Sequence, residues 1–370
     1  MHRKCKITMQ QRWYGIYLIP LRKISGTLRK NLLALLSILV CVPVWAQKTQ
    51  YKVLAIGSYN CENLFDTEDD PDKKDEDFTP DGAFSYTPEI YRQKLHNIAT
   101  VIAEMGSDVT PDGPAVLGLV EIENDKVLTD LCAQPEIARR HYKHVWFPTS
   151  DERGISTALL YNPKYFTLLQ ARPLKVPLES IGQFRPTRDI LYVTGLLSGD
   201  TIHILVNHWP SKSGGSTSEQ GRRLAAQVCK TLTDSLNAAT TAPKILLMGD
   251  LNDNPDCYAV RKILEAQPQK DKLKKGAIYN PWMSMHKKGM GTENYQGDWH
   301  MLDQIMLSEA LVSNENDKWK YYDARIFNKD FLINKLGKSK GLPHRSFTIA
   351  HVWDNGYSDH FPVLVYLISK

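Results

Sequence analysis

Short apolar runs that end in polar residues recur along the chain and predict its β-strands. These runs lie at residues 52–59, 115–120, 145–147, 157–161, 191–197, 201–206, 245–248, 304–307 and 363–368. The turn-forming sequence Ser198-Gly199-Asp200 separates two of the runs, which predicts a β-hairpin between them. The acidic stretch from Asp66 to Asp81 interrupts the pattern, and we expect it to be a solvated loop.

Two segments have the apolar spacing of amphipathic helices. The first begins at Thr87-Pro88-Glu89, which supplies a capping threonine, a proline at the first helical position and an acid in the first turn. It ends at Gly106, and the second helix covers Glu219 to Leu236. Strands outnumber helices and several are joined by short turns. This pattern favours an α/β fold whose sheets contain antiparallel pairs and are covered by a few helices.

The first 46 residues differ in composition from the rest of the chain. They contain eight Lys or Arg and no acid, followed by the apolar run Leu32 to Val44 and then Trp45-Ala46. This order is typical of a secretory signal peptide cleaved after Ala46. It predicts a secreted or periplasmic protein without membrane insertion after cleavage, and an uncleaved membrane anchor is the alternative. Residues 47–370 then form the mature domain.

The leader also accounts for the positive charge of the chain. Removing its eight basic residues from the total of 46 leaves 38 against 41 acidic residues, which turns the formal charge from +5 to −3. The mature protein therefore has no overall basic field that would attract nucleic acid. Any phosphate binding must come from a local basic patch or a metal ion. Four cysteines remain after cleavage, and the sequence leaves their three alternative pairings open.

Polar side chains stand where several predicted strands end. They are Asn60, Glu121, Gly249-Asp250-Leu251-Asn252 and, just before the last strand, Ser358-Asp359-His360. Strand ends in layered α/β folds face a crevice on a rigid scaffold, so these residues are candidates for one site.

Their chemistry suits a metal-dependent reaction. Glu121 and Asp359 are candidate ligands for Mg²⁺, which prefers oxygen and is often held by one or two carboxylates. Glu123 and Asn124 stand beside Glu121 and are candidate supporting partners.

Phosphate chemistry is indicated by a second group of residues. Asn60 and Asn252 carry amides that donate to phosphate oxygens, and Asp250 carries a carboxylate that activates water. His208 and His360 provide two imidazoles, a suitable pair for phosphodiester cleavage, and Asp303 is the expected orienting partner of His360. Each residue taken alone also has a structural interpretation, as a hydrogen-bonded polar group at a strand end.

The order of these residues resembles the endonuclease/exonuclease/phosphatase family, from about Val53 to Leu367. Gly-Asp-Leu-Asn and Ser-Asp-His are the most specific motifs. The resemblance implies a four-layer α/β sandwich, with two mixed sheets face to face and helices outside. It also implies a phosphoesterase that uses Mg²⁺, with Mn²⁺ or Ca²⁺ as alternatives. The metal site would contain Glu121, Asn60 and Asp359, and the catalytic residues would be His208, Asp250, Asn252, Asp303 and His360.

Two positions depart from the family pattern. Val120 replaces the usual glutamine before the metal-binding glutamate, and Ser156 stands where related secreted proteins often carry aspartate.

The segment Asn207 to Gly215 is similar to that of bacterial extracellular nucleases, which implies nucleic acid as the substrate. The candidate substrate-binding residues are Asn207, Lys212, Arg185, Arg188 and Arg222, with Arg223 beside them. One alternative is a phosphatase of inositol phosphates, other small phosphorylated molecules or lipid headgroups. Another is a catalytically inactive binding module, which the filled site positions disfavour. We expect a monomer without a stable protein partner. The choice of DNA or RNA, of endo- or exonucleolytic cleavage, and of one or two metal ions stays open.

Overall fold

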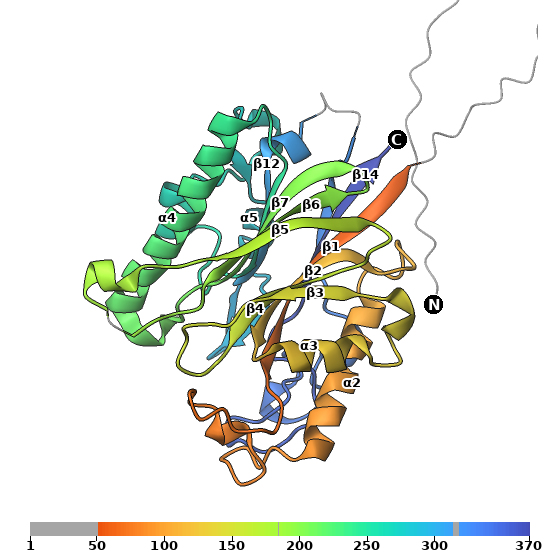
Figure 1. Cartoon of the computed structure of the whole chain (residues 1–370), viewed down its shortest axis with the longest axis vertical. Helices are drawn as coiled ribbons and strands as arrows, with labels where there is room; N and C mark the ends of the chain where they lie inside the picture. Colours follow the sequence, from red (N-terminus) through yellow and green to blue (C-terminus); the bar gives the residue numbers. More distant parts are fainter. Residues whose placement is uncertain (1–50, 184, 314–317) are drawn as a thin grey trace, which may run out of the picture. The chain divides into compact units, whose positions relative to one another are not determined.

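Two six-stranded sheets form the centre of the protein in the computed structural model (Figure 1). The structure describes residues 51–183, 185–313 and 318–370, so the predicted signal peptide lies outside the described residues. Within these ranges, no helix has both the length and the apolar character needed to cross a membrane.

The first sheet has the strand order β13-β14-β1-β2-β4-β3. Its strands are β1 (Lys52–Leu64), β2 (Pro114–Ile122), β3 (Lys143–Trp146), β4 (Ser156–Tyr161), β13 (Lys320–Ile326) and β14 (Val363–Ser369). Only β1 and β2 pair in parallel within this sheet, so the sheet is mixed.

The second sheet has the order β5-β6-β7-β8-β12-β9 and is also mixed, because β7 and β8 are parallel. Its strands are β5 (Phe166–Leu174), β6 (Ile190–Leu197), β7 (Asp200–His208), β8 (Ile245–Asp250), β9 (Ile278–Tyr279) and β12 (Asp303–Ser308). A small separate hairpin consists of β10 (Glu293–Tyr295) and β11 (Asp298–His300).

Helices lie outside the two sheets (Figure 1). The α-helices are α2 (Pro88–Glu104), α3 (Asp125–Cys132), α4 (Gly215–Ala239) and α5 (Met283–His286). Single 3₁₀ turns occur at η1 (Glu76–Phe78), η2 (Ala138–Arg140), η3 (Leu178–Ile181), η4 (Lys212–Gly214), η6 (Lys270–Lys272), η7 (Glu309–Leu311), η8 (Asp330–Leu332) and η9 (Gly337–Ser339), and a π-helical turn at η5 (Ala259–Ile263).

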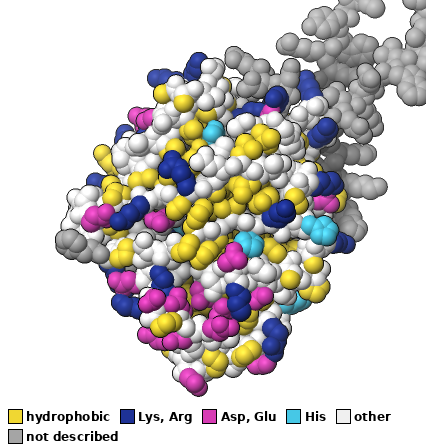
Figure 2. Space-filling view, viewed as in Figure 1, with side chains coloured by type: hydrophobic (Ala, Val, Ile, Leu, Met, Phe, Trp, Pro, Cys, Tyr) yellow, Lys and Arg dark blue, Asp and Glu magenta, His cyan; other side chains and the backbone are white. Residues whose placement is uncertain are grey.

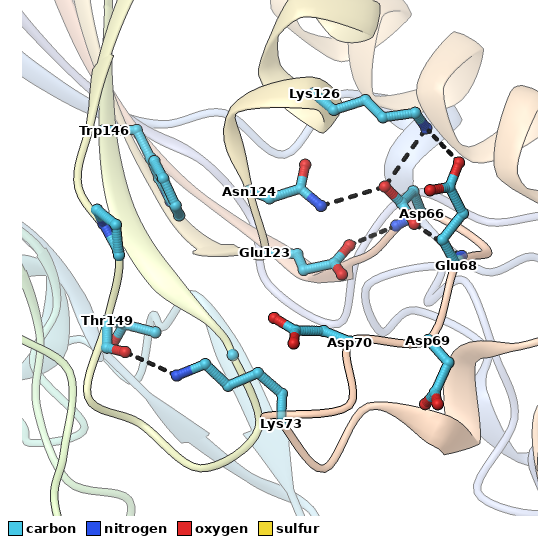
Figure 3. Close-up of a pocket in the computed structure, with 12 residues that line it drawn as sticks. Asp66, Glu68, Asp69, Asp70, Lys73, Glu123, Asn124, Lys126, Trp146 and Thr149 are labelled. Carbon is cyan, nitrogen blue, oxygen red and sulfur yellow. Dashed lines mark hydrogen bonds and ion pairs between the residues drawn. The ribbon is translucent and has the colours of Figure 1, made fainter.

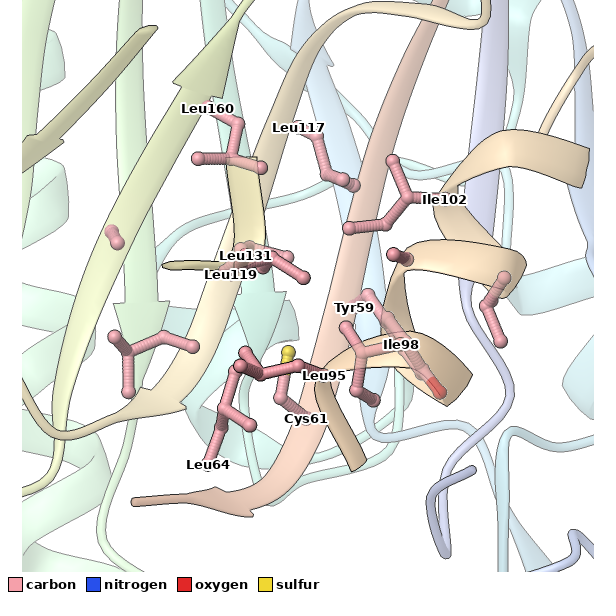
Figure 4. Close-up of a cluster of buried hydrophobic side chains, with 14 of the residues drawn as sticks. Tyr59, Cys61, Leu64, Leu95, Ile98, Ile102, Leu117, Leu119, Leu131 and Leu160 are labelled. Carbon is pink, nitrogen blue, oxygen red and sulfur yellow. The ribbon is translucent and has the colours of Figure 1, made fainter. Parts of the chain in front are cut away.

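Three apolar clusters define the layers. The first joins α2 and α3 to the outer face of the first sheet, with Ile98 and Ile102 packed near Tyr59 and Leu117 (Figure 4). The second fills the space between the sheets, and the third joins α4 to the outer face of the second sheet. The order is therefore helices, sheet, sheet, helix, which confirms the predicted four-layer α/β sandwich.

The predicted elements are present with adjusted bounds. Thr87 caps α2 by accepting a hydrogen bond from the backbone N–H of Ile90 at 3.4 Å, and Pro88 is the first helical residue. The predicted second helix is longer than expected, because α4 already begins at Gly215.

The sequence pattern missed several strands. The strands β5, β9, β10, β11 and β13 were not predicted. Strand β5 lies at a sheet edge and exposes residues on both faces, so it lacks the alternation that would reveal it.

The acidic stretch between β1 and α2 is not uniformly solvated. Asp66 is 4 % exposed and Asp75 is 2 % exposed, so the expectation of a surface loop is wrong at these two positions. Each of these two buried carboxylates accepts at least one hydrogen bond within the protein. The carboxylate of Asp66 accepts from Asn124, and that of Asp75 accepts from the N–H of Asp70.

Candidate active site

The topology brings the predicted strand-end residues to one edge of the two sheets. The parallel pairs place the carboxyl ends of β1 and β2, and of β7 and β8, on the same side. Within the second sheet, Asp250 is the register partner of both His208 and Asp303. The start of β14 pairs antiparallel with β1, which delivers the preceding His360 to the same edge.

Asn60 links the carboxylates contributed by the two sheets. Its Nδ2 donates to Oε1 of Glu121 at 3.3 Å and to Oδ2 of Asp250 at 3.2 Å. Its Oδ1 accepts from the N–H of Glu62 at 2.9 Å, which fixes the orientation of the amide. Asn60 therefore holds two acids of distant origin side by side.

Two of the site residues have left-handed backbone conformations. Glu121 has φ +62° and Asn252 has φ +49°, values that non-glycine residues adopt at a cost. Hydrogen bonds hold both in place. Glu121 Oε2 accepts from the N–H of Asn63 at 2.8 Å, and the N–H of Asn252 donates to Asp250 Oδ1 at 2.8 Å. Such strain is concentrated at functional sites, which agrees with their predicted roles.

His208 lies close to both carboxylates. Its Nε2 is 3.6 Å from Glu121 Oε1 and 3.7 Å from Asp250 Oδ2, and its buried Nδ1 has no hydrogen-bond partner within the described part of the chain. Burial, together with the positive charges of Arg188 and Arg153, holds the pKa of His208 well below its ordinary value. The imidazole is therefore neutral near pH 7.

His360 is in the opposite state. Its Nδ1 lies 2.6 Å from Oδ2 of Asp303, and both side chains are buried. Burial by itself would lower the pKa of His360, but the charge and hydrogen bond of Asp303 raise it well above the ordinary value, with help from Asp250. The site thus combines one neutral and one cationic imidazole.

The electrostatics of Asp250 follow from its surroundings. Burial raises its pKa to about 7; the charge of His360 opposes this shift, and those of Asp303 and Glu121 add to it. A carboxylate with such a pKa is suited to take a proton from water near neutral pH.

These residues line an open cleft of about 520 Å³. Its walls include Glu121, His208, Asp250, Asn252, His360, Arg185 and Arg188. The backbone oxygen of Trp209 accepts from Asn252 Nδ2 at 3.0 Å and from Arg188 Nη2 at 2.7 Å, which holds a basic side chain close to Asn252. Arg185 is exposed, and its Nε lies 3.1 Å from Glu152 Oε2.

Several predicted substrate-binding residues do not line this cleft. Asn207 is fully buried, and its amide donates to the backbone oxygens of Leu205 and Met248. Arg222 is also buried, and its Nε lies 3.0 Å from Asp253 Oδ2. Both side chains are used inside the protein, because neighbouring segments bury them. Lys212 is exposed, lies outside the cleft lining and approaches His300 at 3.5 Å.

Three candidates for the metal region point elsewhere. The carboxylate of Asp359 accepts from Arg345 Nη2 at 3.0 Å and does not line the cleft. Glu123 accepts from the N–H of Asp66 at 2.6 Å, and Asn124 donates to the carboxylate of Asp66 at 3.1 Å. Glu123 and Asn124 therefore surround a neighbouring pocket rather than supporting Glu121 (Figure 3).

Sequence reasoning missed residues that hold this site together. Asp151 and Arg153 line the cleft, and Asp151 Oδ2 lies 3.4 Å from Arg188 Nη1. Thr292 Oγ1 accepts from the N–H of Asp303 at 3.1 Å. All three come from loops without a strand-end motif, so the pattern contained no signal for them.

The two departures from the family pattern are accommodated inside the first sheet. Val120 is fully buried between the sheets. Ser156 Oγ donates to the backbone oxygen of Ile122 at 2.9 Å and accepts from Trp146 Nε1.

All four cysteines among the described residues are free, so the structure forms none of the disulfide pairings that the sequence left open.

Comparison with protein-family models assigns the described domain. The model described as "Endonuclease/Exonuclease/phosphatase family" matches residues 55–369. The chain belongs to this family. The predicted resemblance is therefore confirmed, and the family relationship supports a hydrolase that acts on phosphate esters. No curated protein sequence matches the chain.

Solved structures of similar fold agree with this assignment. An endonuclease/exonuclease/phosphatase family protein from Bacteroides thetaiotaomicron has a TM-score of 0.52 at 14% identity, covering 87% of this chain and 99% of the other. Humanized D. rerio TDP2 carrying 14 mutations has a TM-score of 0.51 at 14% identity, covering 85% and 98%. At such low identity these likenesses show the shared fold alone.

The family typically uses a divalent metal, and the site fits a hard cation. Glu121 carries a carboxylate in the cleft beside that of Asp250, and Mg²⁺ is often held by one or two carboxylates with water completing its shell. A cation would also offset the negative charges that help to raise the pKa of Asp250. Asn60 fits less directly as a ligand, because its Nδ2, and not its Oδ1, faces the two carboxylates.

Proposed function

We propose that the protein is a secreted, Mg²⁺-dependent nuclease that hydrolyses phosphodiester bonds of DNA or RNA. One observation carries this proposal. Two carboxylates, Glu121 and Asp250, and two imidazoles of opposite protonation, His208 and His360, meet in a single open cleft.

Each residue has a role that follows from its state. Cationic His360 would face the phosphate oxygens and stabilise the charge that develops during attack. Asp250 would accept a proton from the attacking water, and Asn252 would position water or phosphate beside it. Glu121 would hold the cation, with water completing its shell, and the cation would supply Lewis-acid polarisation of the phosphate. Neutral His208 would accept a hydrogen bond or a proton next to Glu121 and Asp250.

The cleft walls support nucleic acid as the substrate. Arg185 and Arg188 line the cleft next to the catalytic edge, and Lys212 lies on the adjoining 3₁₀ turn η4. A polymer needs phosphate contacts beyond the scissile bond, and these side chains supply positive charge where the predicted mature chain has a net charge of −3.

A panel of substrates tests the proposal. Plasmid DNA, single-stranded DNA, RNA, an inositol phosphate and p-nitrophenyl phosphate are incubated with the purified protein in Mg²⁺ or in EDTA. We expect Mg²⁺-dependent cleavage of nucleic acid, with Asp250→Asn as the inactive control for contaminating nucleases. Hydrolysis of the small esters without cleavage of any polymer would replace the nuclease proposal with that of a phosphatase.

Export is a separate part of the proposal and rests on the leader sequence. Intact-mass analysis of the exported protein should give an N-terminus at or near Gln47. Retention of residues 1–46 would favour a membrane-anchored form.

A further inference from the structure

The loop between β1 and α2 carries an acidic cluster outside the cleft. Carboxylate oxygens of Asp69, Asp75 and Glu76 all lie within 4.8 Å of one another, the only such group of three among the described residues. Figure 3 shows Asp69 at the edge of the pocket that Glu123 borders, with its side chain directed away from Asp66. Acidic side chains also gather over this end of the molecule in Figure 2.

The burial of Asp75 is a second observation that points to a bound cation. Its side chain is almost completely buried, with 2 % exposure of the residue. Its Oδ2 accepts from the N–H of Asp70 at 3.2 Å, whereas no group of the described residues donates to its buried Oδ1. A buried carboxylate oxygen that has lost water and gained no partner is costly. A cation bound between the three carboxylates would satisfy it.

The loop's own lysines do not neutralise the cluster. Lys73 Nζ donates to the backbone oxygens of Thr149 at 2.8 Å and Asp151 at 3.2 Å. Lys74 Nζ lies 2.6 Å from Glu152 Oε2. Among the described residues, no lysine, arginine or histidine pairs with Asp69, Asp75 or Glu76. The three carboxylates are therefore free of protein cations within the described residues, which leaves them available to a bound cation.

The donor set selects the kind of cation. Ca²⁺ takes about 6–8 oxygen ligands and is commonly held by several carboxylates, whereas Mg²⁺ keeps several waters and is usually bound by only one or two carboxylates. Three carboxylates that can share one ion therefore fit Ca²⁺ better than Mg²⁺. We propose that Asp69, Asp75 and Glu76 form a Ca²⁺ site that is distinct from the catalytic metal site.

The site has a structural consequence for the cleft. Lys73 and Lys74 lie between the proposed ligands in the sequence, and both bind the segment 149–152. That segment contains Asp151 and Glu152, which line the cleft. A bound Ca²⁺ would therefore fix the loop that braces one wall of the cleft.

Ca²⁺-dependent protection tests the proposal without relying on activity. The EDTA-treated full chain is titrated with Ca²⁺ or Mg²⁺, and both its Tm and its cleavage after Lys73 and Lys74 by endoproteinase Lys-C are measured. Saturating Ca²⁺ should raise Tm by roughly 3–6 °C and slow the cleavage several-fold. Mg²⁺ should require much higher concentrations.

Matched variants locate the effect. Asp69→Asn and Asp75→Asn should abolish the Ca²⁺ response, and Asp69 is exposed, so its substitution should leave folding intact. Asp72→Asn makes the same charge change in the same loop outside the cluster and should retain the response. Glu121→Gln should also retain it. The proposal is overturned if Asp69→Asn keeps the response, if Glu121→Gln abolishes it, or if Mg²⁺ protects as well as Ca²⁺.

Discussion

His360 Nδ1 lies 2.6 Å from Oδ2 of Asp303, which joins the segment before the last strand to the start of β12. In the cationic imidazole Nδ1 donates to this carboxylate, which fixes the plane of the ring in the cleft. It is also the largest contribution that raises the pKa of His360. The pair therefore acts as one unit, in which Asp303 works through His360.

Removal of the Asp303 charge should weaken catalysis through His360. Asp303→Asn should lower the His360 pKa, measured by NMR titration, and shift the pH–rate profile to lower pH. His360→Ala should reduce kcat by about 10²–10⁴-fold. The double variant should then be no worse than His360→Ala alone. If the loss of kcat in the double variant equals the product of the two single losses, Asp303 and His360 act independently, which would contradict their action as one unit.

The charge of Glu121 should be essential for metal-dependent activity. Glu121→Gln keeps the side-chain shape but removes the negative charge that holds the cation, so most activity should be lost with little change in Tm. High Mg²⁺ should restore part of it. Glu123→Gln is the matched control, because Glu123 faces the neighbouring pocket. Full activity of the wild-type enzyme in EDTA would remove the metal from the reaction.

Arg185 should contribute to nucleic-acid affinity, because it lines the cleft and its side chain is exposed. Arg185→Gln should weaken DNA binding and reduce the slope of log Kd against log salt concentration by about 1. Arg223→Gln is the control, since Arg223 pairs with Glu219 on α4 outside the cleft. Fluorescence anisotropy at several salt concentrations measures both variants. Equal effects of the two substitutions would place the binding surface elsewhere.

The titration of His203 should lower the free energy of unfolding of the protein at acidic pH. Burial lowers its pKa, and its Nδ1 lies 2.8 Å from the hydroxyl of Tyr192. The unfolded chain therefore binds the proton first, and stability present above about pH 6.5 is lost as the pH falls through the lowered folded-state pKa. His203→Gln removes this titration. Urea unfolding measures the free energy of unfolding of both proteins, and the value for the variant minus that for wild type should increase as the pH is lowered from 7.5 to 5. If this difference does not change with pH, His203 does not contribute to the acid sensitivity.

The sequence determined much of the catalytic set. Polar residues directly after apolar runs identified Asn60, Glu121 and Asp250, because a strand carries its alternation and its end in local sequence. His208 was predicted because it also ends an apolar run, and Asp303 was predicted as the orienting partner of His360; the structure brings all of these residues to one edge. Their catalytic roles remain predictions.

The tertiary structure decided which charged side chains face the cleft. Arg188 and Arg222 look alike in sequence, yet only Arg188 lines the cleft, whereas Arg222 is bound to Asp253 inside the protein. Asp359 is directed to Arg345, and Asp75 is buried within a stretch that reads as a solvated loop.

The reason is that burial and ion pairing depend on segments far apart along the chain. Asn60 and Asp250 meet although 190 positions separate them, and no local pattern encodes such a contact. The protonation states of the two histidines likewise depend on residues that are distant in the sequence. Two histidines with the same intrinsic pKa become neutral at His208 and cationic at His360, because packing buries the first near arginines and the second against Asp303.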